Sequence, residues 1–476
     1  MHPEDSEVPF FEQSSYQTIH SRYRFAPTDS AQHGNMSPGD VIAGSVSALP
    51  ADCFAVRIQI VFSAAPGSSG EVVFRGYLGH GADETATPPV RSVLSGGRVQ
   101  TITLDPYFFS IPGGELEFRI ERVREDPAAT AFSPITLEAL HVIPVQAPAA
   151  PVTVDGSAGY STWPMIQSVN GRLICIYSRG TGHDIGEAVR AVYARGSADG
   201  IHWDKEEIPV WNTAGCGDVP VGKGIDENGE LLVWIRSYGK ELHHTLFRSG
   251  DGRSFTPVCR PEFDPMPMQM TDIVHVPTVG LMCLWFAGTY QEEHNSWGTM
   301  VSCDNGATWE QRIVEAELHI ADWPTEPSAV YFGEGRILAV GRTESRRSST
   351  ECAQFQLESS DYGRTWTKHR TNITDVATST PSLILDPETG ILSNYYFHRL
   401  RGILKCRRVK AVKIWGRPLD WPEPEILGFG SPIDAGNVNA VRMGKRHFVA
   451  WYSRRSSGIS GILATGCPIP EKDSVM

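Results

Sequence analysis

The sequence predicts an all-β protein, with a six-bladed β-propeller over residues 158–470 and an antiparallel β-sandwich over residues 1–145. Three observations support this fold class: a turn motif that recurs at a nearly constant interval, apolar strands between its copies, and a different alternating pattern in the first 145 residues. A period near 50 residues with β-rich content is typical of four-stranded propeller blades.

The recurring motif is a Ser-x-Asp-x-Gly-x-Thr-Trp turn. It is complete in "SCDNGATW" (302–309) and "SSDYGRTW" (359–366), and shorter in "SADGIHW" (197–203) and "SGDGRSF" (249–255). In such a turn the Asp side chain caps backbone N–H groups, Gly takes a positive φ, and the aromatic residue packs onto the next strand. The four Asp positions recur every 52 to 57 residues, which is a blade-like spacing.

The segments between the turns read as strands. Each begins at a turn Gly or a charge, runs apolar and ends polar, as in "GRLICIYSRG", "GELLVWIRSYG", "VGLMCLWFAGTY", "GRILAVGRTES" and "KRHFVAWYSRR". A degenerate unit at about 376–426 and a last one at about 432–466 bring the predicted number of blades to six.

The first 145 residues lack the turn motif. Instead, "CFAVRIQIVFSAA", "GEVVFRGYLGHG", "GRVQTITLD" and "GELEFRIERVRED" alternate apolar and polar residues between Gly, Pro and Ser turns, which predicts the sandwich. The Pro- and Ala-rich residues 146–157 are predicted to form a linker. Such a sandwich could act as a spacer, as an oligomerisation module or as a carbohydrate-binding module.

Composition narrows the class of partner. The net charge of −13 over 476 residues argues against nucleic acid or an anionic membrane surface as the ligand. Nine scattered cysteines without a CxxC pair indicate buried thiols, so neither a metal nor a cofactor is predicted. No apolar run is long enough for a membrane span, and the start shows no Sec signal, so a cytoplasmic or virion-associated protein is expected.

The repeated Asp turns in a six-bladed propeller resemble those of the sialidase (neuraminidase) superfamily, whose turns are called Asp-boxes or BNR repeats. The resemblance covers about residues 158–470 and implies a glycoside hydrolase that acts on an acidic sugar. Because the same turns occur in non-catalytic propellers, the function has to be argued from the residues of the central cleft.

Two segments carry the resemblance in the cleft. In "PTEPSAVYFGEGRILAVGRTES", Glu326 and Arg342 are spaced like the family's catalytic Glu and one arginine of its triad. In "NYYFHRLRGILKCRR", Arg401 best fits a second triad arginine, with Arg399 as the alternate. Guanidinium groups bind carboxylates bidentately, so a pair facing one cleft indicates an acidic sugar. The alternative is that these are solvated surface charges.

Two other segments depart from the family. The first blade has Tyr160 in "GYSTWPMI" but Ser or Thr where the family has its third arginine. The following "YSRGTGHDIGE" contains Arg179, a candidate for substrate binding together with Tyr160. In the same segment Asp184 is the nearest counterpart of the family's general acid, and His183 is a candidate for proton transfer or sugar binding. The last blade has Gly436 to Asn439 where the family has its nucleophilic Tyr.

Three functions remain open. The first is a glycosidase that uses Glu326 and the arginines, with Asp184 or His183 as the acid. The second is an endo-acting polysaccharide depolymerase, which resembles phage endosialidases in lacking the usual Tyr and third arginine. The third is a glycan-binding propeller without catalysis. In each case the expected partner is an acidic oligosaccharide or polysaccharide, and a homo-oligomer is a further expectation.

Overall fold

The computed structural model describes residues 35–38, 41–46, 55–78, 85–86, 90–104, 116–123, 133–145, 148–288, 293–344, 353–376, 378–399, 401–431, 434–456 and 459–471. The all-β prediction is confirmed: the only helices in these ranges are α1 (Ala411–Ile414) and one 3-10 turn (Ile320–Asp322). None of the described helices has the length and apolarity that crossing a membrane requires.

The N-terminal part contains two antiparallel sheets that share one hydrophobic core. The first sheet has the order β1 (Asn35–Met36), β9 (Ile135–Val145), β3 (Ala55–Ala64), β7 (Val99–Leu104). The second has the order β2 (Val41–Val46), β8 (Leu116–Arg122), β4 (Glu71–Leu78), β5 (Thr85–Ala86), with β6 (Val90–Val93) also on β4. The alternating apolar residues, among them Ile58, Ile60, Phe62, Phe74 and Ile120, are buried together between them. The period-two pattern thus marks the inward face of each strand.

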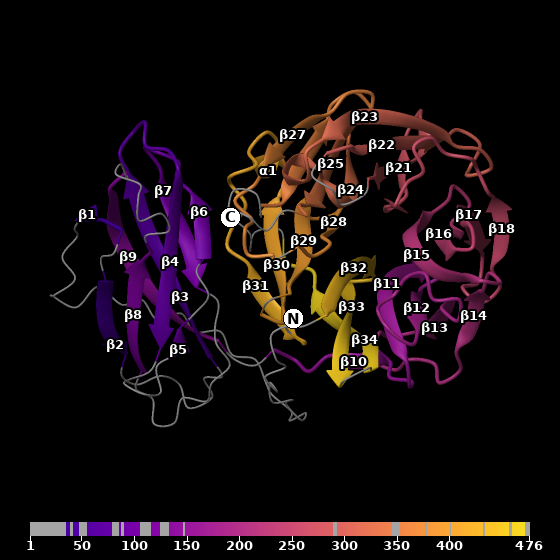
Figure 1. The fold of residues 1–476 in the computed structure, drawn as a ribbon, viewed down its shortest axis with the longest axis horizontal. Coiled ribbons are helices and arrows are strands. Elements are labelled where there is room, and N and C mark those ends of the chain that lie inside the picture. Colours follow the sequence, from indigo (N-terminus) through magenta and orange to yellow (C-terminus); the bar gives the residue numbers. More distant parts are fainter. Residues whose placement is uncertain are drawn as a thin grey trace.

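The described residues between 152 and 468 form five further sheets arranged in a ring (Figure 1). The largest has the order β14 (Ile208–Trp211), β13 (Ala191–Ser197), β12 (Arg172–Gly180), β11 (Tyr160–Val169), β34 (Ile459–Pro468), β33 (Arg446–Ser456), β32 (Ala435–Met443), with β10 (Val152–Asp155) on β34. The next is β15 (Cys216–Ile225), β16 (Leu231–Gly239), β17 (Leu242–Ser249), β18 (Thr256–Cys259).

The other three sheets follow around the ring in chain order. One contains β19 (Gln269–Met270), β21 (Gly280–Ala287), β22 (Asn295–Ser302) and β23 (Glu310–Leu318), with β20 (Val274–Val276) on β21. The next contains β24 (Thr325–Gly333), β25 (Arg336–Arg342), β26 (Phe355–Ser359) and β27 (Thr367–Arg370). The last contains β28 (Ser382–Leu385), β29 (Ile391–His398), β30 (Ile403–Lys410) and β31 (Glu425–Phe429).

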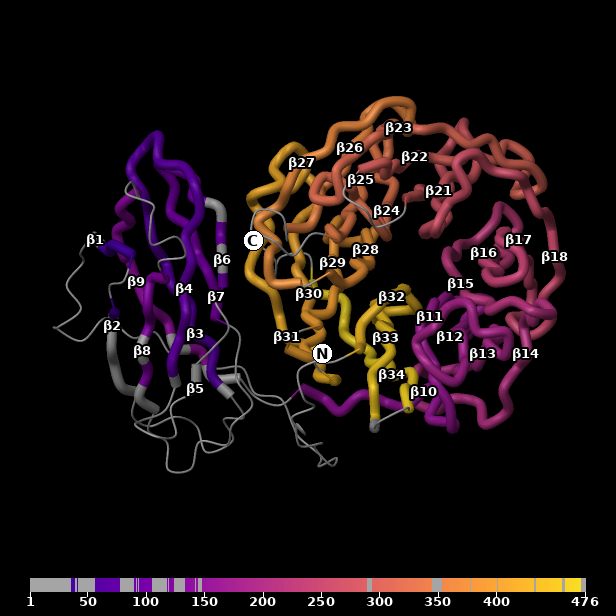
Figure 2. The backbone as a smooth tube through the Cα atoms, in the orientation of Figure 1, coloured from indigo at the N-terminus to yellow at the C-terminus, as the bar shows by residue number. Residues whose placement is uncertain are grey.

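The ring closes where its first and last strands meet (Figure 2). Tyr160 of β11 pairs in parallel with Ser460 of β34, and β10 pairs antiparallel with the same strand. Part of the predicted linker is therefore a strand, β10. Its buried Asp155 accepts hydrogen bonds from Ser161 and from Arg195. The pairing of β10 and β11 with β34 holds together segments about 300 residues apart in the sequence.

Each of the four recurring turns connects the outermost strand of a sheet to its neighbour: β13 to β14, β17 to β18, β22 to β23 and β26 to β27. In the turn after β22, the Ser302 hydroxyl accepts a hydrogen bond from Gly306 N at 2.7 Å, and Asp304 accepts from Thr308 N at 2.8 Å. Gly306 has φ +93°, in the left-handed region that favours glycine. Trp309 then packs edge-on against Trp234 of the preceding sheet at 5.4 Å. Neither Asp304 nor Asp361 lines the central cavity described below.

Polar contacts connect the N-terminal sheets to the ring. Arg57 of β3 donates to Pro424 O at 2.9 Å, and Arg98 pairs with Asp420 at 3.2 Å. Both partners lie in the segment between α1 and β31, so the β3–β7 side of the first sheet faces the β28–β31 sheet.

The turns predict an acid-dependent stability. Hydrogen bonds from Thr308 and then from Ser302 lower the pKa of Asp304 to about 2. A carboxyl group whose pKa is lower in the folded state stabilises the fold above its unfolded pKa, roughly 4, and the contribution disappears as the pH falls toward 2. The urea unfolding free energies of the wild type and Asp304→Ala should therefore differ at pH 6 and converge by pH 2. A difference that stays constant over this range would contradict the prediction.

Candidate functional site

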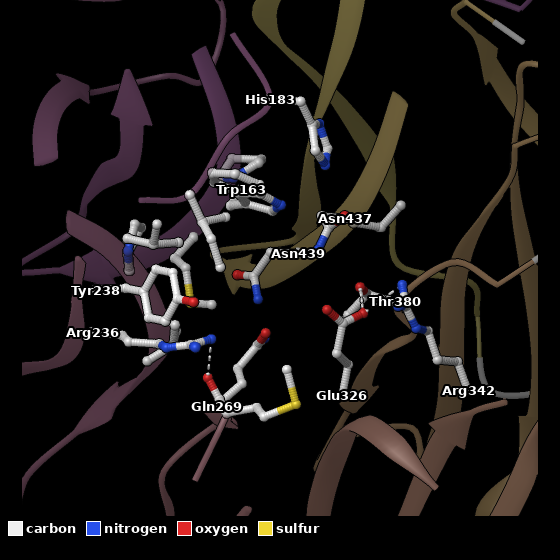
Figure 3. Close-up of a pocket in the computed structure, with 18 of the residues that line it drawn as sticks. Trp163, His183, Arg236, Tyr238, Gln269, Glu326, Arg342, Thr380, Asn437 and Asn439 are labelled. Carbon is white, nitrogen blue, oxygen red and sulfur yellow. Dashed lines mark hydrogen bonds and ion pairs between the residues drawn. The ribbon is translucent and has the colours of Figure 1, made fainter. Parts of the chain in front are cut away.

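A cavity of about 440 Å³ opens where the inner strands of the ring approach one another (Figure 3). Its size lies in the range of roughly 300–1,000 Å³ that is usual for small-ligand sites. It is lined by Trp163, Pro164, Met165, His183, Asp184, Ile185, Val219, Pro220, Val221, Arg236, Tyr238, Met268, Gln269, Glu326, Arg342, Thr380, Arg399, Asn437, Val438 and Asn439.

Three of these side chains come from the same kind of backbone feature. Trp163, Glu326 and Asn437 have φ values of +51°, +44° and +44°, each inside a register shift of an inner strand, β11, β24 or β32. A bulge re-aims the residue that it contains. Trp163 and Glu326 each lie between a Thr and a Pro, so the same short sequence pattern forms the bulge in both strands with a different central side chain.

Glu326 is 8% exposed and is held by two neighbours. Its Oε2 accepts an ion pair from Arg342 Nη1 at 2.8 Å and a hydrogen bond from the Thr380 hydroxyl. No described residue donates a hydrogen bond to Oε1, so a ligand can use that oxygen. The predicted pair of Glu326 and Arg342 is thus in direct contact at the cavity.

Arg342 is fixed by a clamp of acceptors. Its Nε and Nη2 donate to Glu344 Oε1 at 2.9 and 2.6 Å, and Nη1 donates to Thr378 O at 2.8 Å. Two carboxylates, Glu326 and Glu344, therefore share this guanidinium. The clamp fixes the orientation of Arg342 relative to the cavity.

Arg399, the alternate candidate from the sequence, is the second arginine on the side of the cavity that contains Glu326 and Arg342. Arg399 follows β29 and donates from Nε to Ala435 O at 2.8 Å and from Nη2 to Asn437 Oδ1 at 2.6 Å. Arg401 lies in the next turn, where its N–H donates to His398 O, and it does not line the cavity. The chain reverses at this turn, and it is Arg399 that contacts β32 at the cavity.

No carboxylate of the described residues lies within 4.0 Å of Arg399. Burial lowers the pKa of Arg399, and so does the nearby charge of Arg342, while Tyr452, Glu326 and Glu344 offset part of this shift. An anion bound here would offset both effects.

A third arginine, Arg236 on β16, was not among the predicted site residues. Its Nη1 donates to Met268 O at 2.8 Å, and its guanidinium lies 5.1 Å from the ring centre of Tyr238. Figure 3 shows this pair across the cavity from Arg342. The sequence did contain a signal, because "GELLVWIRSYG" has an arginine near the end of a second strand, as "GRILAVGRTES" does.

His183 and Asp184 lie in the loop after β12 and both line the cavity. His183 Nδ1 lies 2.9 Å from Asp434 Oδ1, and Tyr452 donates to the same oxygen at 3.1 Å. Burial lowers the pKa of His183, as do the charges of Arg399 and Arg190, while burial raises the pKa of Asp434. Asp184 Oδ1 accepts from Gly186 N at 2.8 Å within the loop.

Trp163 and Arg190 support this loop. The ring of Trp163 packs edge-on against His183 at 5.3 Å, and the Arg190 guanidinium lies 4.9 Å from the Trp163 ring. Arg190 Nε also donates to Asp184 O at 2.9 Å. Arg190 is fully buried, so its contacts with Asp184 O and with the Trp163 ring hold both the loop and the ring against the interior of the protein.

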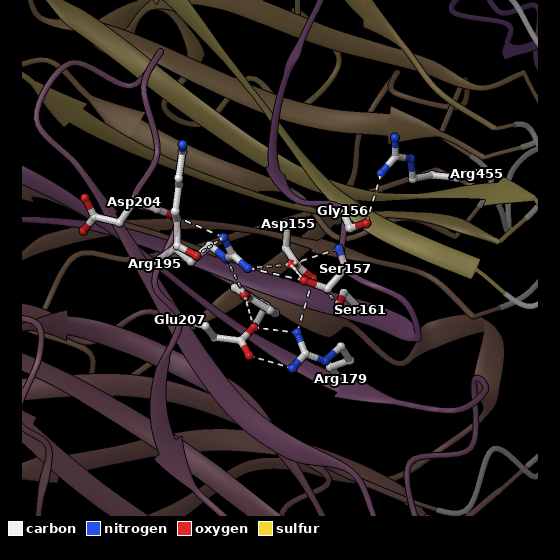
Figure 4. A network of polar contacts seen from close by, with 11 residues as sticks. Asp155, Gly156, Ser157, Ser161, Arg179, Arg195, Asp204, Glu207 and Arg455 are labelled. Carbon is white, nitrogen blue, oxygen red and sulfur yellow. Dashed lines mark hydrogen bonds and ion pairs between the residues drawn. The ribbon is translucent and has the colours of Figure 1, made fainter.

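Arg179 and Tyr160 were predicted to bind substrate, but neither lines the cavity. Arg179 makes a bidentate pair with Glu207 at 2.5 and 2.6 Å, part of the polar network shown in Figure 4. Glu207 precedes β14, the outer edge of the sheet, so Arg179 is directed away from the centre. Tyr160 is 5% exposed and approaches the site only through its ring contact with His183 at 6.1 Å.

Among the described residues that line the cavity, no tyrosine lies beside Glu326. Among its lining residues Tyr238 is the one tyrosine, on the opposite wall, and Asn437 occupies the inner strand where the resemblance implies a nucleophile. Tyr452 is 1% exposed, donates to Asp434 and does not line the cavity. Within the described ranges no group of three or more His, Cys, Asp or Glu side chains could hold a metal ion.

Solved structures similar to this one show the fold. A protein of unknown function from Dyadobacter fermentans aligns with a TM-score of 0.57 and 18% identity, over 68% of this chain and 99% of that one. The Hadza microbial sialidase Hz136 aligns with a TM-score of 0.54 and 16% identity, over 90% and 95%. No family model and no curated protein matches the sequence. The chain thus has a sialidase-like, all-β fold.

The geometry predicts that Arg179 stabilises the fold and does not bind ligand. Its side chain is 18% exposed and pairs with Glu207, so Arg179→Met leaves a carboxylate without its bidentate partner. Removing one partner of a buried pair costs about 3 kcal/mol or more. Urea denaturation should show a loss of this size. Replacing exposed Arg253 with Met is the matched control, and an equally small effect of both changes would contradict the assignment.

Proposed function

We propose that the protein is a glycosidase of the sialidase superfamily that cleaves the bond to an acidic sugar bound in this cavity. In this proposal the ring is a six-bladed propeller whose eight-stranded sheet contains the first and last blades. Residues 1–145 form the sandwich, as a carbohydrate-binding or oligomerisation module. The sialidase-like fold supports the proposal, but the argument for the activity comes from the cavity.

The main observation is Arg399 beside the Arg342–Glu326 pair. Three arginines line the cavity of a chain whose net charge is −13, and Glu326 and Glu344 both pair with Arg342. Arg399 has a carbonyl and an amide oxygen as its hydrogen-bond partners, so an anionic ligand is favoured at this arginine. The planar guanidinium of Arg399, with no described carboxylate on it, suits the carboxylate of a sugar.

The same residues can carry out hydrolysis. With a sugar carboxylate on Arg399, the anomeric carbon can approach Glu326 Oε1. As the glycosidic C–O bond breaks, the negative charge of Glu326 stabilises the oxocarbenium-like transition state, or Oε1 accepts a proton from the attacking water. A proton must also reach the leaving oxygen, and Asp184 at the cavity edge is the proposed donor.

His183 is better suited to accept a proton than to donate one. Its lowered pKa favours the neutral imidazole, whose Nδ1–H donates to Asp434 and whose Nε2 then carries the lone pair. Asp434 fixes this tautomer, and Tyr452 fixes Asp434. This arrangement favours Asp184 over His183 as the acid and gives His183 the task of binding water or a sugar hydroxyl.

A second candidate is a glycan-binding protein without catalysis. The observation that favours it is Asn437, whose amide donates and accepts hydrogen bonds but cannot form the covalent intermediate that the resemblance implies for a tyrosine. Binding of an acidic glycan without release of product would establish this candidate.

Arg399→Ala should weaken the binding of an acidic sugar by about 2–5 kcal/mol, because the ligand carboxylate loses its charged partner. Isothermal titration with N-acetylneuraminic acid and with glucuronic acid measures the loss, and the methyl ester of whichever sugar binds tests the role of its carboxylate. Arg401→Ala is the matched control two positions away. Equal binding by the wild type and Arg399→Ala would refute the role of Arg399.

Glu326→Gln should lower turnover by about two to four orders of magnitude while binding persists, since the amide keeps the shape of the side chain but loses its charge. An aryl glycoside of the sugar that binds gives the rate. Hydrolysis should also proceed without a tyrosyl-glycoside, which incubation with a fluorinated sugar and intact-mass measurement can test. A stoichiometric adduct on any tyrosine would overturn this mechanism.

A further inference from the structure

We propose that the cavity also breaks chains of 4-linked uronic acids by β-elimination, with His183 as the base that removes the proton next to the carboxylate. Hydrolysis at Glu326 consumes water and breaks a bond at the anomeric carbon, whereas elimination consumes no water and breaks the bond at C-4 of the uronate. The inference rests on the proposed function for the carboxylate site at Arg399, and it goes beyond that function in the reaction and in the class of sugar.

The first argument is that one short segment, at the start of β32, connects the base to the carboxylate site. Asp434 Oδ1 lies 2.9 Å from His183 Nδ1. Three residues later, Asn437 Oδ1 accepts a hydrogen bond from Arg399 Nη2 at 2.6 Å. Figure 3 shows the His183 ring directed toward Asn437. A sugar carboxylate on Arg399 therefore has its neighbouring carbon on the side of the cavity that the imidazole faces.

The second argument is the state of the imidazole. Because Nδ1 faces Asp434, the neutral ring has its proton on Nδ1 and its lone pair on Nε2, which has no hydrogen-bond partner among the described residues. Burial lowers the pKa of His183, as do the charges of Arg399 and Arg190, so the ring is a base at neutral pH. Tyr452 donates to the same Asp434 oxygen at 3.1 Å, which fixes the carboxylate that stabilises the imidazolium once it forms.

The third argument is that the site can stabilise the charge that elimination creates. Removing a proton from the carbon next to a carboxylate moves further negative charge onto the carboxylate oxygens, so the reaction needs fixed donors there. The acceptors of the Arg399 guanidinium are uncharged, and the Asn437 oxygen faces Arg399, which leaves its amide nitrogen as a donor. An amide at this position suits elimination, because elimination forms no covalent intermediate with the protein.

The steps balance between His183 and the substrate. Nε2 takes the proton from C-5, the electron pair of that C–H bond forms the double bond between C-4 and C-5, and the bond from C-4 to oxygen breaks with its electron pair on the oxygen. The imidazolium then gives the proton to this oxygen, which leaves as a hydroxyl of the departing sugar. Since one residue acts on one face, the hydrogen at C-5 and the oxygen at C-4 must lie on the same side of the ring. Glucuronate has this configuration and galacturonate does not.

The test follows the products that the full chain forms from 4-linked polyglucuronate and polygalacturonate in ¹⁸O-labelled water. Elimination gives an unsaturated end that absorbs ultraviolet light and carries no label, whereas hydrolysis gives a saturated end with the label, and mass spectrometry separates them. The wild type should form unsaturated ends from polyglucuronate and none from polygalacturonate. His183→Ala should lower this rate by about two to four orders of magnitude. Asp434→Asn should lower kcat about tenfold or more with little change in KM, because Asp434 acts through the imidazole.

The controls separate this inference from the proposed function. His202 forms the same kind of pair, with Asp199 at 2.7 Å, on an outer turn, so His202→Ala should alter neither reaction. Unfolding by urea confirms that each variant is folded. Labelled, saturated ends alone, or no product from either polymer, would overturn the elimination, and so would unsaturated ends that persist in His183→Ala. Hydrolysis of the aryl glycoside decides the proposed function separately, so unsaturated ends without that hydrolysis would support the elimination and overturn the glycosidase.

Discussion

The site depends on a left-handed backbone conformation at inner-strand bulges. Trp163, Glu326 and Asn437 all have a positive φ, which costs a non-glycine residue about 1–3 kcal/mol each. An inner strand without the bulge would direct these side chains to the faces of its sheet, where they would pack between neighbouring sheets. The bulge instead directs them into the space that the sheets enclose.

Hydrogen bonds between neighbouring inner strands hold these bulges in place. Asn439 Oδ1 accepts from Ile166 N at 2.9 Å, and Ser382 Oγ accepts from Ala440 N at 2.9 Å. Ser328 Oγ accepts from Leu383 N at 2.9 Å and donates to Asp272 at 2.6 Å. Each contact joins a polar side chain of one inner segment to another inner segment, within the eight-stranded sheet for Asn439 and between sheets for the serines, so the innermost layer forms its own network. The unfavourable conformations therefore persist because several strands impose them together.

The electrostatics of the cavity follow from this arrangement. Glu326 meets Arg342 only because β24 and β25 are antiparallel neighbours, with Thr325 opposite Arg342 in the register. Arg399 arrives from another sheet and is oriented by the backbone and amide of β32. One wall therefore contains the Glu326–Arg342 ion pair and Arg399, whose hydrogen-bond acceptors are uncharged. The facing wall has a cation supported by an aromatic ring.

The loop after β12 adds the titratable groups. Arg190 anchors it, Trp163 packs against it, and Asp434, which precedes β32, holds its histidine. The loop therefore connects the first inner strand to the last, near the point where Tyr160 and Ser460 close the ring. The closure of the ring and the placement of His183 rest on the same junction between distant segments.

The sequence by itself determined the all-β class, the positions of the turns and the pairing of Glu326 with Arg342. These are local properties: hydrogen bonds within a turn, alternation along a strand, and two residues on adjacent strands joined by a short turn. The sequence also showed Asn437 where the resemblance implies a tyrosine. It ranked Arg401 above Arg399, selected Arg179, and did not identify Arg236 or Asp434.

Only the tertiary structure decided among the arginines. Arg179, Arg236 and Arg342 each come near the end of a second strand, and their local sequences look alike. What differs is the partner that the fold brings to each: Glu207 at the outer edge for Arg179, Met268 and Tyr238 for Arg236, and Glu326 for Arg342. Glu326 lies on the strand next to that of Arg342, which a local pattern can encode. Glu207 is 28 residues from Arg179 and Met268 is 32 residues from Arg236, so the directions of these two arginines depend on how distant segments pack together.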